Sequence, residues 1–177
     1  HDPTITALGG LKLITYDGPE ATARDVVMSD GMRASFWDSL LFFYSGRHAR
    51  TKPSLDLLGS QLDQALEVLH AMRSVALELE HAFGDGDLRR VCEIIGEQQS
   101  LKQRLPGKFV VDSGLDVTRR VRSEGAFAQL PGGKISAFVI VACPDGPEQK
   151  DRVRRALHDL DEVRFGYEPR GTRAVSI

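Results

Sequence analysis

SLDLLGSQLDQALEVLHAMRSVALELEHAFGDGDLRRVCEIIGEQQSLKQRL, residues 54–105, is the stretch of the chain that decides its fold. Its first part places apolar side chains three or four residues apart, which is the spacing of one face of an α-helix. These residues are Leu58, Leu62, Ala65, Leu66, Leu69, Met72, Ala76, Leu79 and Phe83. Gly84 and Gly86 then end the helix, and Asp87 is suited to cap the next one.

A second apolar stripe follows, and Pro106-Gly107 ends it. Its members are Leu88, Val91, Cys92, Ile95, Leu101 and Leu105. Because the connection between the two stripes is short, we predict two antiparallel helices joined as a hairpin. Both stripes need a covering surface, and we expect a β-sheet formed by the other segments to provide it.

The segments before the hairpin carry strand patterns, and one of them is the unbroken apolar run LLFFY at 40–44. Such a run is typical of a buried central strand. We also expect a strand at 11–16 after two glycines, a turn at 17–20, and a pairing strand at 23–28 whose apolar part is 26–28. The segment 29–39 is expected to be irregular, with a helical turn at 32–37. A cation-rich loop is expected at 45–53.

The segments after the hairpin mix helices and strands. We expect a helix at 112–123, a glycine-bearing loop at 125–133, a strand at 135–142, an amphipathic helix at 148–160, a strand at 162–168 and a returning strand at 172–177. The order predicts an α+β fold, with a mainly antiparallel sheet covered on one face by the helical hairpin and further helices. We take residues 1–177 as one domain.

Composition narrows the function. A formal net charge of -2 on 177 residues gives no overall field toward nucleic acid or an anionic membrane, so we expect neither as a partner. The sequence has no signal peptide and no apolar run long enough to span a bilayer, so a cytoplasmic location is expected. Cys92 and Cys143 lie in apolar runs and are predicted to be buried free thiols. Because the chain opens HDPTITALGG without an initiator Met, we expect a piece of a longer protein.

Two candidate sites carry charged side chains. Asp2 lies near Gly9-Gly10, and a carboxylate beside a glycine turn can orient or deprotonate a substrate hydroxyl. A frayed terminal aspartate is the alternative. Arg47 and Arg50 belong to the cation-rich loop, which can hold a phosphate or be a plain solvated loop.

A third candidate site is Gly132-Gly133, where backbone amides can approach a phosphate, although a simple turn explains the pair equally well. The histidines show no metal-ligand spacing, and the chain has no Cys/His metal pattern and no serine nucleophile motif. We therefore expect no metal site built by the protein alone.

Taken in order, these segments resemble the carboxy-terminal half of a small-molecule kinase of the GHMP superfamily, most closely the kinases of heptose phosphates. The family carries QDQ followed by AxGGL, then LLLFYTG, then GDL, and finally FxxEPxGxR. The counterparts here are HDPTITALGGL at 1–11, LLFFYSG at 40–46, GDL at 86–88 and FGYEPRGTR at 165–173. The resemblance rests on the order and spacing of these segments and runs nearly end to end.

The resemblance implies transfer of the γ-phosphate of ATP, bound with Mg²⁺, to a hydroxyl of a sugar or sugar phosphate. It implies Asp2 as the catalytic base, Gly9, Gly10, Arg47 and Arg50 as substrate-binding residues, and Gly132 and Gly133 as part of the phosphate-side loop. It also implies that an amino-terminal half, which binds most of the ATP, is a partner of these residues. The chain alone is then expected to be inactive.

A non-catalytic member with the same fold, acting as a binding or interaction module, is the alternative. The family's glycine-rich loop, KLxGAGGGGF, is matched here by QLPGGKISAF at 129–138, in which most glycines are replaced. His1 and Pro3 also stand where the family has glutamines beside the aspartate. The altered loop favours the module, and the retained Asp2 favours the enzyme. A stable fragment without activity of its own is the third possibility.

Overall fold

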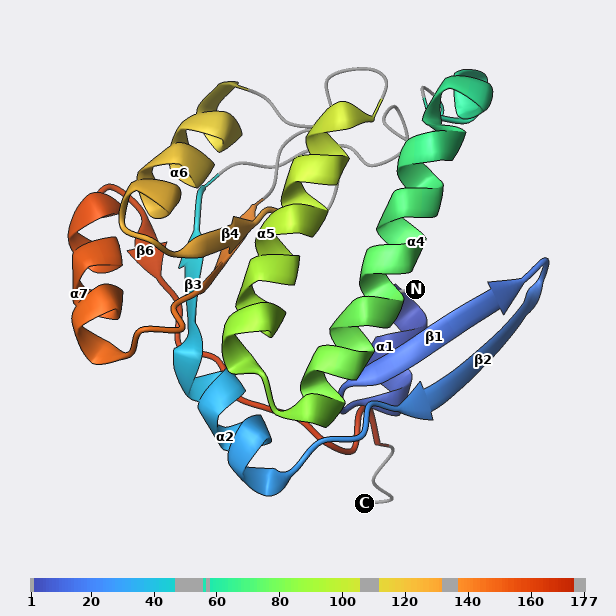
Figure 1. Ribbon diagram of the computed structural model, residues 1–177, viewed down its shortest axis with the longest axis horizontal. Helices are drawn as coiled ribbons and strands as arrows, with labels where there is room; N and C mark the ends of the chain where they lie inside the picture. Colours follow the sequence, from blue (N-terminus) through green and yellow to red (C-terminus); the bar gives the residue numbers. More distant parts are fainter. Residues whose placement is uncertain (1, 47–55, 57, 106–111, 132–136, 174–177) are drawn as a thin grey trace.

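The structure is a computed structural model that describes residues 2–46, 56, 58–105, 112–131 and 137–173, without the side chains of residues 2, 3, 112 and 113. Figure 1 shows the arrangement of the elements. They are, in chain order, α1 (Asp2–Leu8), β1 (Lys12–Asp17), β2 (Glu20–Asp25), α2 (Asp30–Ser39), β3 (Leu40–Tyr44), α4 (Leu62–Asp85), α5 (Leu88–Arg104), α6 (Asp112–Ser123), β4 (Phe127–Gln129), β5 (Phe138–Ala142), α7 (Pro147–Ala156) and β6 (Asp161–Glu162).

Within the described residues, β4, β5, β3 and β6 form one sheet in that order, and each neighbouring pair is antiparallel. β3 pairs with β5 from Leu40–Ala142 to Tyr44–Phe138, and β6 flanks β3 on its other side. The run LLFFY is therefore a central strand, as predicted. The succession strand, helices, two strands, helix, strand is that of a ferredoxin-like sheet. The predicted α+β class and antiparallel sheet are confirmed.

Helices cover both faces of this sheet. Neighbouring residues of a strand point to opposite faces. In β5, Val139 and Val141 pack in a cluster with side chains of α6 and α7, whereas Ile140 and Ala142 pack with side chains of α2, α4 and α5. Figure 1 shows α6 and α7 on one side of β3 and α5 on the other. The expectation that all helices cover one face is wrong, because both alternating sets of residues in β5 are apolar and each needs a cover.

The helices α4 and α5 form the predicted antiparallel hairpin, seen in the centre of Figure 1. Gly86 ends α4 with a left-handed φ of 75°. The side chain of Asp87 accepts a hydrogen bond of 2.9 Å from the backbone N–H of Arg90, which caps α5 as expected. The hairpin is therefore set by its turn residues as well as by its apolar stripes.

The buried line of α4 differs from the predicted stripe in its first half. Val68 is buried, whereas Leu62 and Leu66 are 48% and 43% exposed. Both lines have helical spacing, because the sequence has apolar residues on more than one face. Val68 packs in one cluster with Leu105 at the end of α5, and this contact determines which of the two lines of apolar residues is buried.

The segment 29–39, expected to be irregular apart from a helical turn at 32–37, contains the longer helix α2 from Asp30 to Ser39. The side chain of Ser29 caps it by accepting a hydrogen bond of 3.1 Å from the backbone N–H of Met32. Met32 and Phe36 are buried one turn apart, and Phe36 meets Phe83 of α4 edge-on at 4.9 Å between ring centroids. Two apolar positions are too few to reveal a helix in the sequence, and contact with the hairpin stabilises it.

The strands β1 and β2 form a separate two-stranded antiparallel ribbon, which the sequence predicted. Its second strand ends at Asp25, so the apolar residues 26–28 lie outside it. Val26 and Met28 pack instead against the cluster of the hairpin and α2. Val26 and Met28 therefore contribute to the hydrophobic core and not to the ribbon.

The end of the chain departs most from the prediction. β6 is limited to Asp161–Glu162, and residues 163–173, here called the tail, form no strand. The strand expected at 162–168 is wrong beyond its first residue, because Phe165 and Tyr167 pack on the ring of Trp37 rather than in a sheet. Of the returning strand expected at 172–177, Thr172 and Arg173 are not in a strand, and the rest lies outside the described residues.

The remaining elements follow the prediction with changed limits. α6 has the predicted bounds, α7 ends four residues early at Ala156, and the expected loop at 125–133 contains the short strand β4. β5 begins at Phe138, and residues 135–136 of the expected strand lie outside the described residues. In the described part of the chain, no helix combines the length and apolarity needed to cross a membrane.

Candidate functional site

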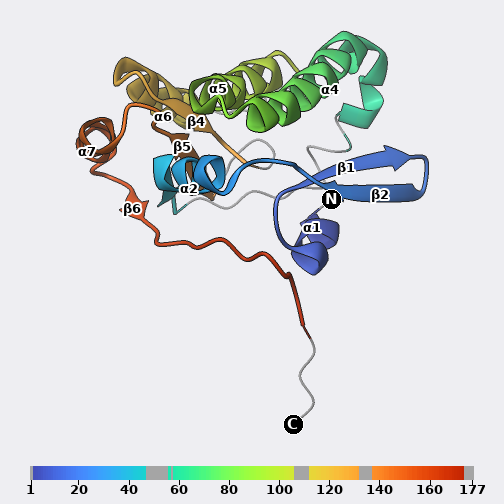
Figure 2. The same cartoon turned by 60° about the horizontal axis from the view of Figure 1, so that its bottom comes forward.

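The two glycines after α1 join the beginning of the chain to the tail (Figures 1 and 2). Gly9 and Gly10 have left-handed φ values of 67° and 72°, which turn the chain from α1 toward β1. The N–H of Gly9 donates to the carbonyl of Ile5 at 2.8 Å, and the N–H of Gly10 donates to the carbonyl of Glu168 at 2.8 Å. Both amides are therefore used within the chain.

Gly9 and Gly171 pack backbone against backbone. A Cβ atom on Gly9 would overlap the nitrogen of Gly171, and one on Gly171 would overlap the carbonyl oxygen of Ala7. The next residue of the tail adds two hydrogen bonds, because the N–H and the hydroxyl of Thr172 donate to the carbonyl of Thr6 at 3.0 and 3.2 Å. The contact therefore requires glycine at both positions.

A hollow of about 420 Å³ opens where α1 and the tail meet. It is lined by Ile5, Thr6, Gly9, Gly10, Glu168, Gly171 and Thr172. Among these residues Glu168 supplies the ionisable group. Its carboxylate accepts a hydrogen bond of 2.8 Å from the N–H of Arg170 and lies 3.8 Å from the guanidinium of Arg173. The hollow thus combines glycine backbone with one fixed carboxylate.

The structure places the residues predicted for the site unevenly. Gly9 and Gly10 line the hollow, and Asp2 is the first residue of α1. At 1.5 Å per residue, α1 separates Asp2 from Gly9 by about 10 Å. Arg47, Arg50, Gly132 and Gly133 lie outside the described residues. The sequence prediction does not include Glu168, Gly171 and Thr172 as site residues, although the segment FGYEPRGTR that contains them carries part of the resemblance.

Leu130, which precedes the third candidate site in the sequence, is held in place by two side chains of α5. Gln99, which is 2% exposed, accepts a hydrogen bond of 3.0 Å from the N–H of Leu130. The ammonium group of Lys102 donates to the carbonyl of the same Leu130. Burial lowers the pKa of Lys102 to about 8. Both backbone groups of Leu130, two residues before Gly132, are therefore fixed by one helix.

The described residues show neither a cluster of metal ligands nor free glycine amides at the hollow. They contain no group of three or more His, Cys, Asp and Glu side chains that could hold a metal ion. The amides of Gly9 and Gly10 are occupied and cannot cradle a phosphate. Cys92 and Cys143 are free and buried, as predicted, and burial raises the pKa of Cys92 to about 11 and that of Cys143 to about 12. Neither thiol is suited to act as a nucleophile.

Comparison with known proteins gives matches among solved structures. No family model matches the sequence, and no curated protein matches it. A structure of L. major mevalonate kinase in complex with R-mevalonate matches with a TM-score of 0.68 and 16% identity, over 89% of this chain and 47% of that chain. A D-glycero-D-manno-heptose 1-phosphate kinase from B. thetaiotaomicron matches with a TM-score of 0.64 and 18% identity, over 97% and 48%.

The chain has the fold of the carboxy-terminal half of a GHMP kinase. It spans about half the length of the solved structures that it matches. The same fold also matches a mevalonate diphosphate decarboxylase from Staphylococcus aureus, with a TM-score of 0.56 and 15% identity. The likeness to these structures therefore shows the fold of this chain. It does not show which reaction the chain takes part in.

Proposed function

We propose that this chain, one domain over residues 1–177, is the carboxy-terminal half of an ATP-dependent kinase for a sugar or sugar phosphate of the heptose type. The observation that carries the proposal is the meeting of two segments from opposite ends of the sequence. Gly9-Gly10 and Glu168–Thr172 line one hollow and are locked together by backbone contact. These are the two segments that carry the resemblance at each end of the chain, and the matched fold includes kinases of small alcohols.

The proposed reaction is a phosphoryl transfer. The substrate hydroxyl attacks the γ-phosphorus of ATP, the bond from that phosphorus to the β-bridging oxygen breaks, and ADP leaves. The proton of the hydroxyl passes to the carboxylate of Asp2, which acts as the general base. Mg²⁺ would neutralise charge on the phosphates. The resemblance implies that it is bound with ATP mainly outside this chain.

The remaining candidate residues bind substrate in this proposal. Arg47 and Arg50 would clamp a phosphate of the sugar, since guanidinium groups bind phosphate in a bidentate manner. Gly9 and Gly10 keep the backbone close to the substrate without side chains. Gly132 and Gly133, which follow the fixed Leu130 in the sequence, would form what is left of the phosphate-side loop.

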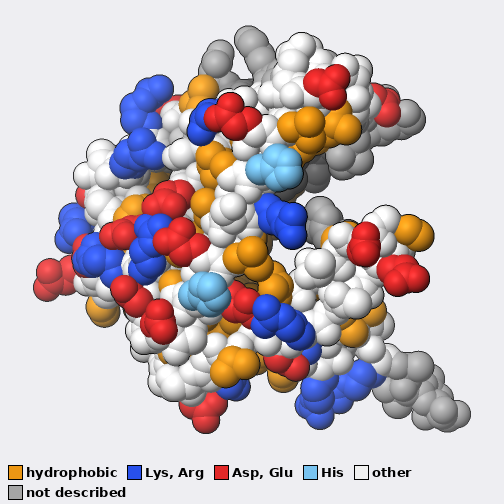
Figure 3. All heavy atoms as spheres, turned by 45° about the vertical axis from the view of Figure 1, so that its right-hand side comes forward, with side chains coloured by type: hydrophobic (Ala, Val, Ile, Leu, Met, Phe, Trp, Pro, Cys, Tyr) orange, Lys and Arg blue, Asp and Glu red, His pale blue; other side chains and the backbone are white. Residues whose placement is uncertain are grey.

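The amino-terminal half is the proposed partner, and the β1–β2 ribbon is its proposed contact. All residues of β2 are exposed, and Tyr16 of β1 is 50% exposed. A two-stranded ribbon is marginally stable alone and leaves its strand edges open for pairing. Arg24 anchors it by a bidentate ion pair to Glu80 of α4, with one contact at 2.7 Å. Figure 3 shows the surface hollowed between the hairpin and the lobe that the ribbon forms. A cytoplasmic location is part of the same proposal.

The experiment measures ADP release by the complete gene product with Mg-ATP and a panel of acceptors. The panel holds heptoses, heptose phosphates, hexoses, hexose phosphates and mevalonate. We expect turnover with one sugar or sugar phosphate well above the ATPase background. Folded protein that binds ATP but turns over mevalonate alone would remove the sugar specificity. Folded protein that releases no ADP with any acceptor would contradict the kinase.

A non-catalytic binding module is the second candidate, favoured by the segment QLPGGKISAF at 129–138. Replacement of the loop glycines adds side chains where the family's backbone approaches a ligand. Calorimetric titration of the same acceptors separates the two candidates. The module predicts saturable binding of a sugar phosphate without ADP release, whereas the kinase predicts both.

A further inference from the structure

A second hollow lies on the hairpin, away from the candidate site. It measures about 640 Å³ and lies between α4, α5, α6 and β4. We call it the α5 groove. It shares no residue with the hollow at α1 and the tail. In Figure 2, α4, α5 and α6 lie at the top and α1 lies below them. Its volume is in the range of about 300–1,000 Å³ that is usual for small-molecule sites.

The floor of the α5 groove is apolar. Val75 and Phe127 belong to the cluster of the hairpin and α2, and Leu101 belongs to the cluster at the open end of the hairpin. These three side chains are only partly buried, because the groove lies where the two clusters separate. Gly96 lets the ring of Phe127 come close, since a Cβ there would lie 2.8 Å from the ring. An apolar body that covers this floor is stabilised by removing its surface from water.

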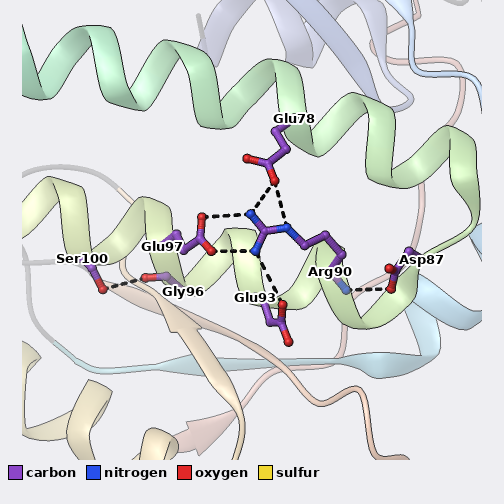
Figure 4. A network of polar contacts seen from close by, with 7 residues as sticks. All are labelled: Glu78, Asp87, Arg90, Glu93, Gly96, Glu97 and Ser100. Carbon is purple, nitrogen blue, oxygen red and sulfur yellow. Dashed lines mark hydrogen bonds and ion pairs between the residues drawn. The ribbon is translucent and has the colours of Figure 1, made fainter.

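One wall of the groove is acidic, but its charge is already engaged. Glu93 and Glu97 line the groove, and both face Arg90, at 3.5 and 2.6 Å. Glu78 of α4 pairs with the same guanidinium at 2.5 Å (Figure 4). Hydrogen bonds to Glu97 and Glu78 raise the pKa of Arg90 above its usual value. This network holds the two helices together, and it leaves Glu93 and Glu97 paired with a cation of the protein itself.

Arg122 of α6 also lines the groove, and it is a cation without a carboxylate partner among the described residues. Among the described residues, the polar contact recorded for Arg122 is one long hydrogen bond of 3.4 Å to the hydroxyl of Ser100, and no carboxylate lies within ion-pair distance. Its neighbours on α6 differ, because Arg119 and Arg120 both pair with Asp116. A guanidinium beside an apolar floor is suited to a carboxylate or phosphate head group.

We propose that the α5 groove binds an amphipathic small molecule, with its apolar body over Val75, Leu101 and Phe127 and its anionic head group on Arg122. The class comprises medium-chain carboxylates and alkyl phosphates, which share an alkyl body and a compact anion. The proposal is independent of kinase activity, because no residue of the groove belongs to the proposed catalytic site.

The test is calorimetric titration of the complete gene product with decanoate, decyl phosphate and decylammonium, each below its micelle concentration. We expect one saturable site for an anionic probe and none for decylammonium. Comparison of decanoate with decyl phosphate identifies the preferred head group. Loss of a charge-assisted contact predicts at least about tenfold weaker binding in Arg122→Gln. Arg119→Gln, on the same helix but outside the groove, is the matched control and should bind as the wild type does.

A second variant tests the location of the apolar body. Ala71 lines the groove on α4, and Ala71→Trp would fill it. This variant should lose the anionic probes while its unfolding transition stays cooperative. Equal binding by wild type and Arg122→Gln, binding of decylammonium as tight as that of decanoate, retained binding in Ala71→Trp, or no saturable binding of any probe would each overturn the proposal.

Discussion

Replacing Gly171 by alanine is expected to release the tail from α1. The added methyl group would overlap the carbonyl oxygen of Ala7 and lie 2.7 Å from the nitrogen of Gly9. Both are backbone atoms, so no rotation of a side chain can relieve the contact. The alanine would also keep a left-handed φ of 63°, which costs a residue with a Cβ about 1–2 kcal/mol.

The magnitude follows from what must separate. Opening the contact breaks three hydrogen bonds, one from Gly10 to Glu168 and two from Thr172 to Thr6, each worth about 0.5–1.5 kcal/mol. Because opening the contact relieves the backbone strain, the strain and the lost bonds do not add, and the free energy that holds the tail on α1 falls by about 1.5–4.5 kcal/mol. Because the tail can detach while the sheet stays folded, the change is local. Hydrogen exchange of the Gly10 and Thr172 amides should become about tenfold faster or more.

The control is Gly86→Ala at the end of α4. Gly86 has a similar φ of 75°, but a Cβ there meets nothing within 4 Å. This variant should lose about 1 kcal/mol of global stability from strain alone and leave exchange at Gly10 and Thr172 unchanged. If Gly171→Ala leaves the two amides as protected as Gly86→Ala does, the proposed lock between the ends of the chain is wrong.

Three further predictions concern stability, each measured by urea unfolding followed by circular dichroism. Arg90→Gln should lose about 1 kcal/mol at low salt, and less at high salt, because Glu78 and Glu97 lose their shared partner on a partly exposed surface; a loss that does not depend on salt would contradict the ionic network. Burial lowers the pKa of Lys102 in the folded protein to about 8 from its ordinary value of 10.5, so the unfolded state binds more protons between these values and stability should rise with pH across this window. The stability of the Lys102→Met variant should rise less over the same pH window. A pH dependence identical to that of the wild type would contradict the burial of the ammonium group. Ser29→Ala should lose about 1 kcal/mol through the missing cap of α2, and an unchanged midpoint would show that the cap is dispensable.

The hairpin and the central strand could be predicted because their signals are local. Apolar spacing and the turn at Gly86-Asp87 define α4 and α5, and the run at 40–44 defines β3. The side of α4 that is buried in its first half could not be predicted, because Val68 and Leu66 both fit a helical spacing of apolar residues. Only contact with Leu105 distinguishes them.

The candidate site was partly visible in the sequence and partly not. Gly9-Gly10 and the segment containing Glu168 and Gly171 were each recognised as motifs. Their meeting is a contact between the two ends of the chain, and no local pattern encodes it. The alternation of apolar and polar residues at 162–168 led to the wrong prediction of a strand. Phe165 and Tyr167 have the spacing of strand residues, but they pack on Trp37.

The measurement that tests the central claim most directly is ³¹P NMR of the complete gene product with Mg-ATP and the acceptor found in the panel. The wild type should convert ATP to ADP together with a new phosphate ester of the acceptor. Asp2→Asn should lower kcat by about 10²–10⁴-fold, as expected for loss of a general base, with circular dichroism unchanged. Asp151→Asn, which removes the same charge from the exposed surface of α7, should retain full activity. An undiminished rate in Asp2→Asn would contradict the assigned base, and ADP with free phosphate in place of the ester would contradict the kinase itself.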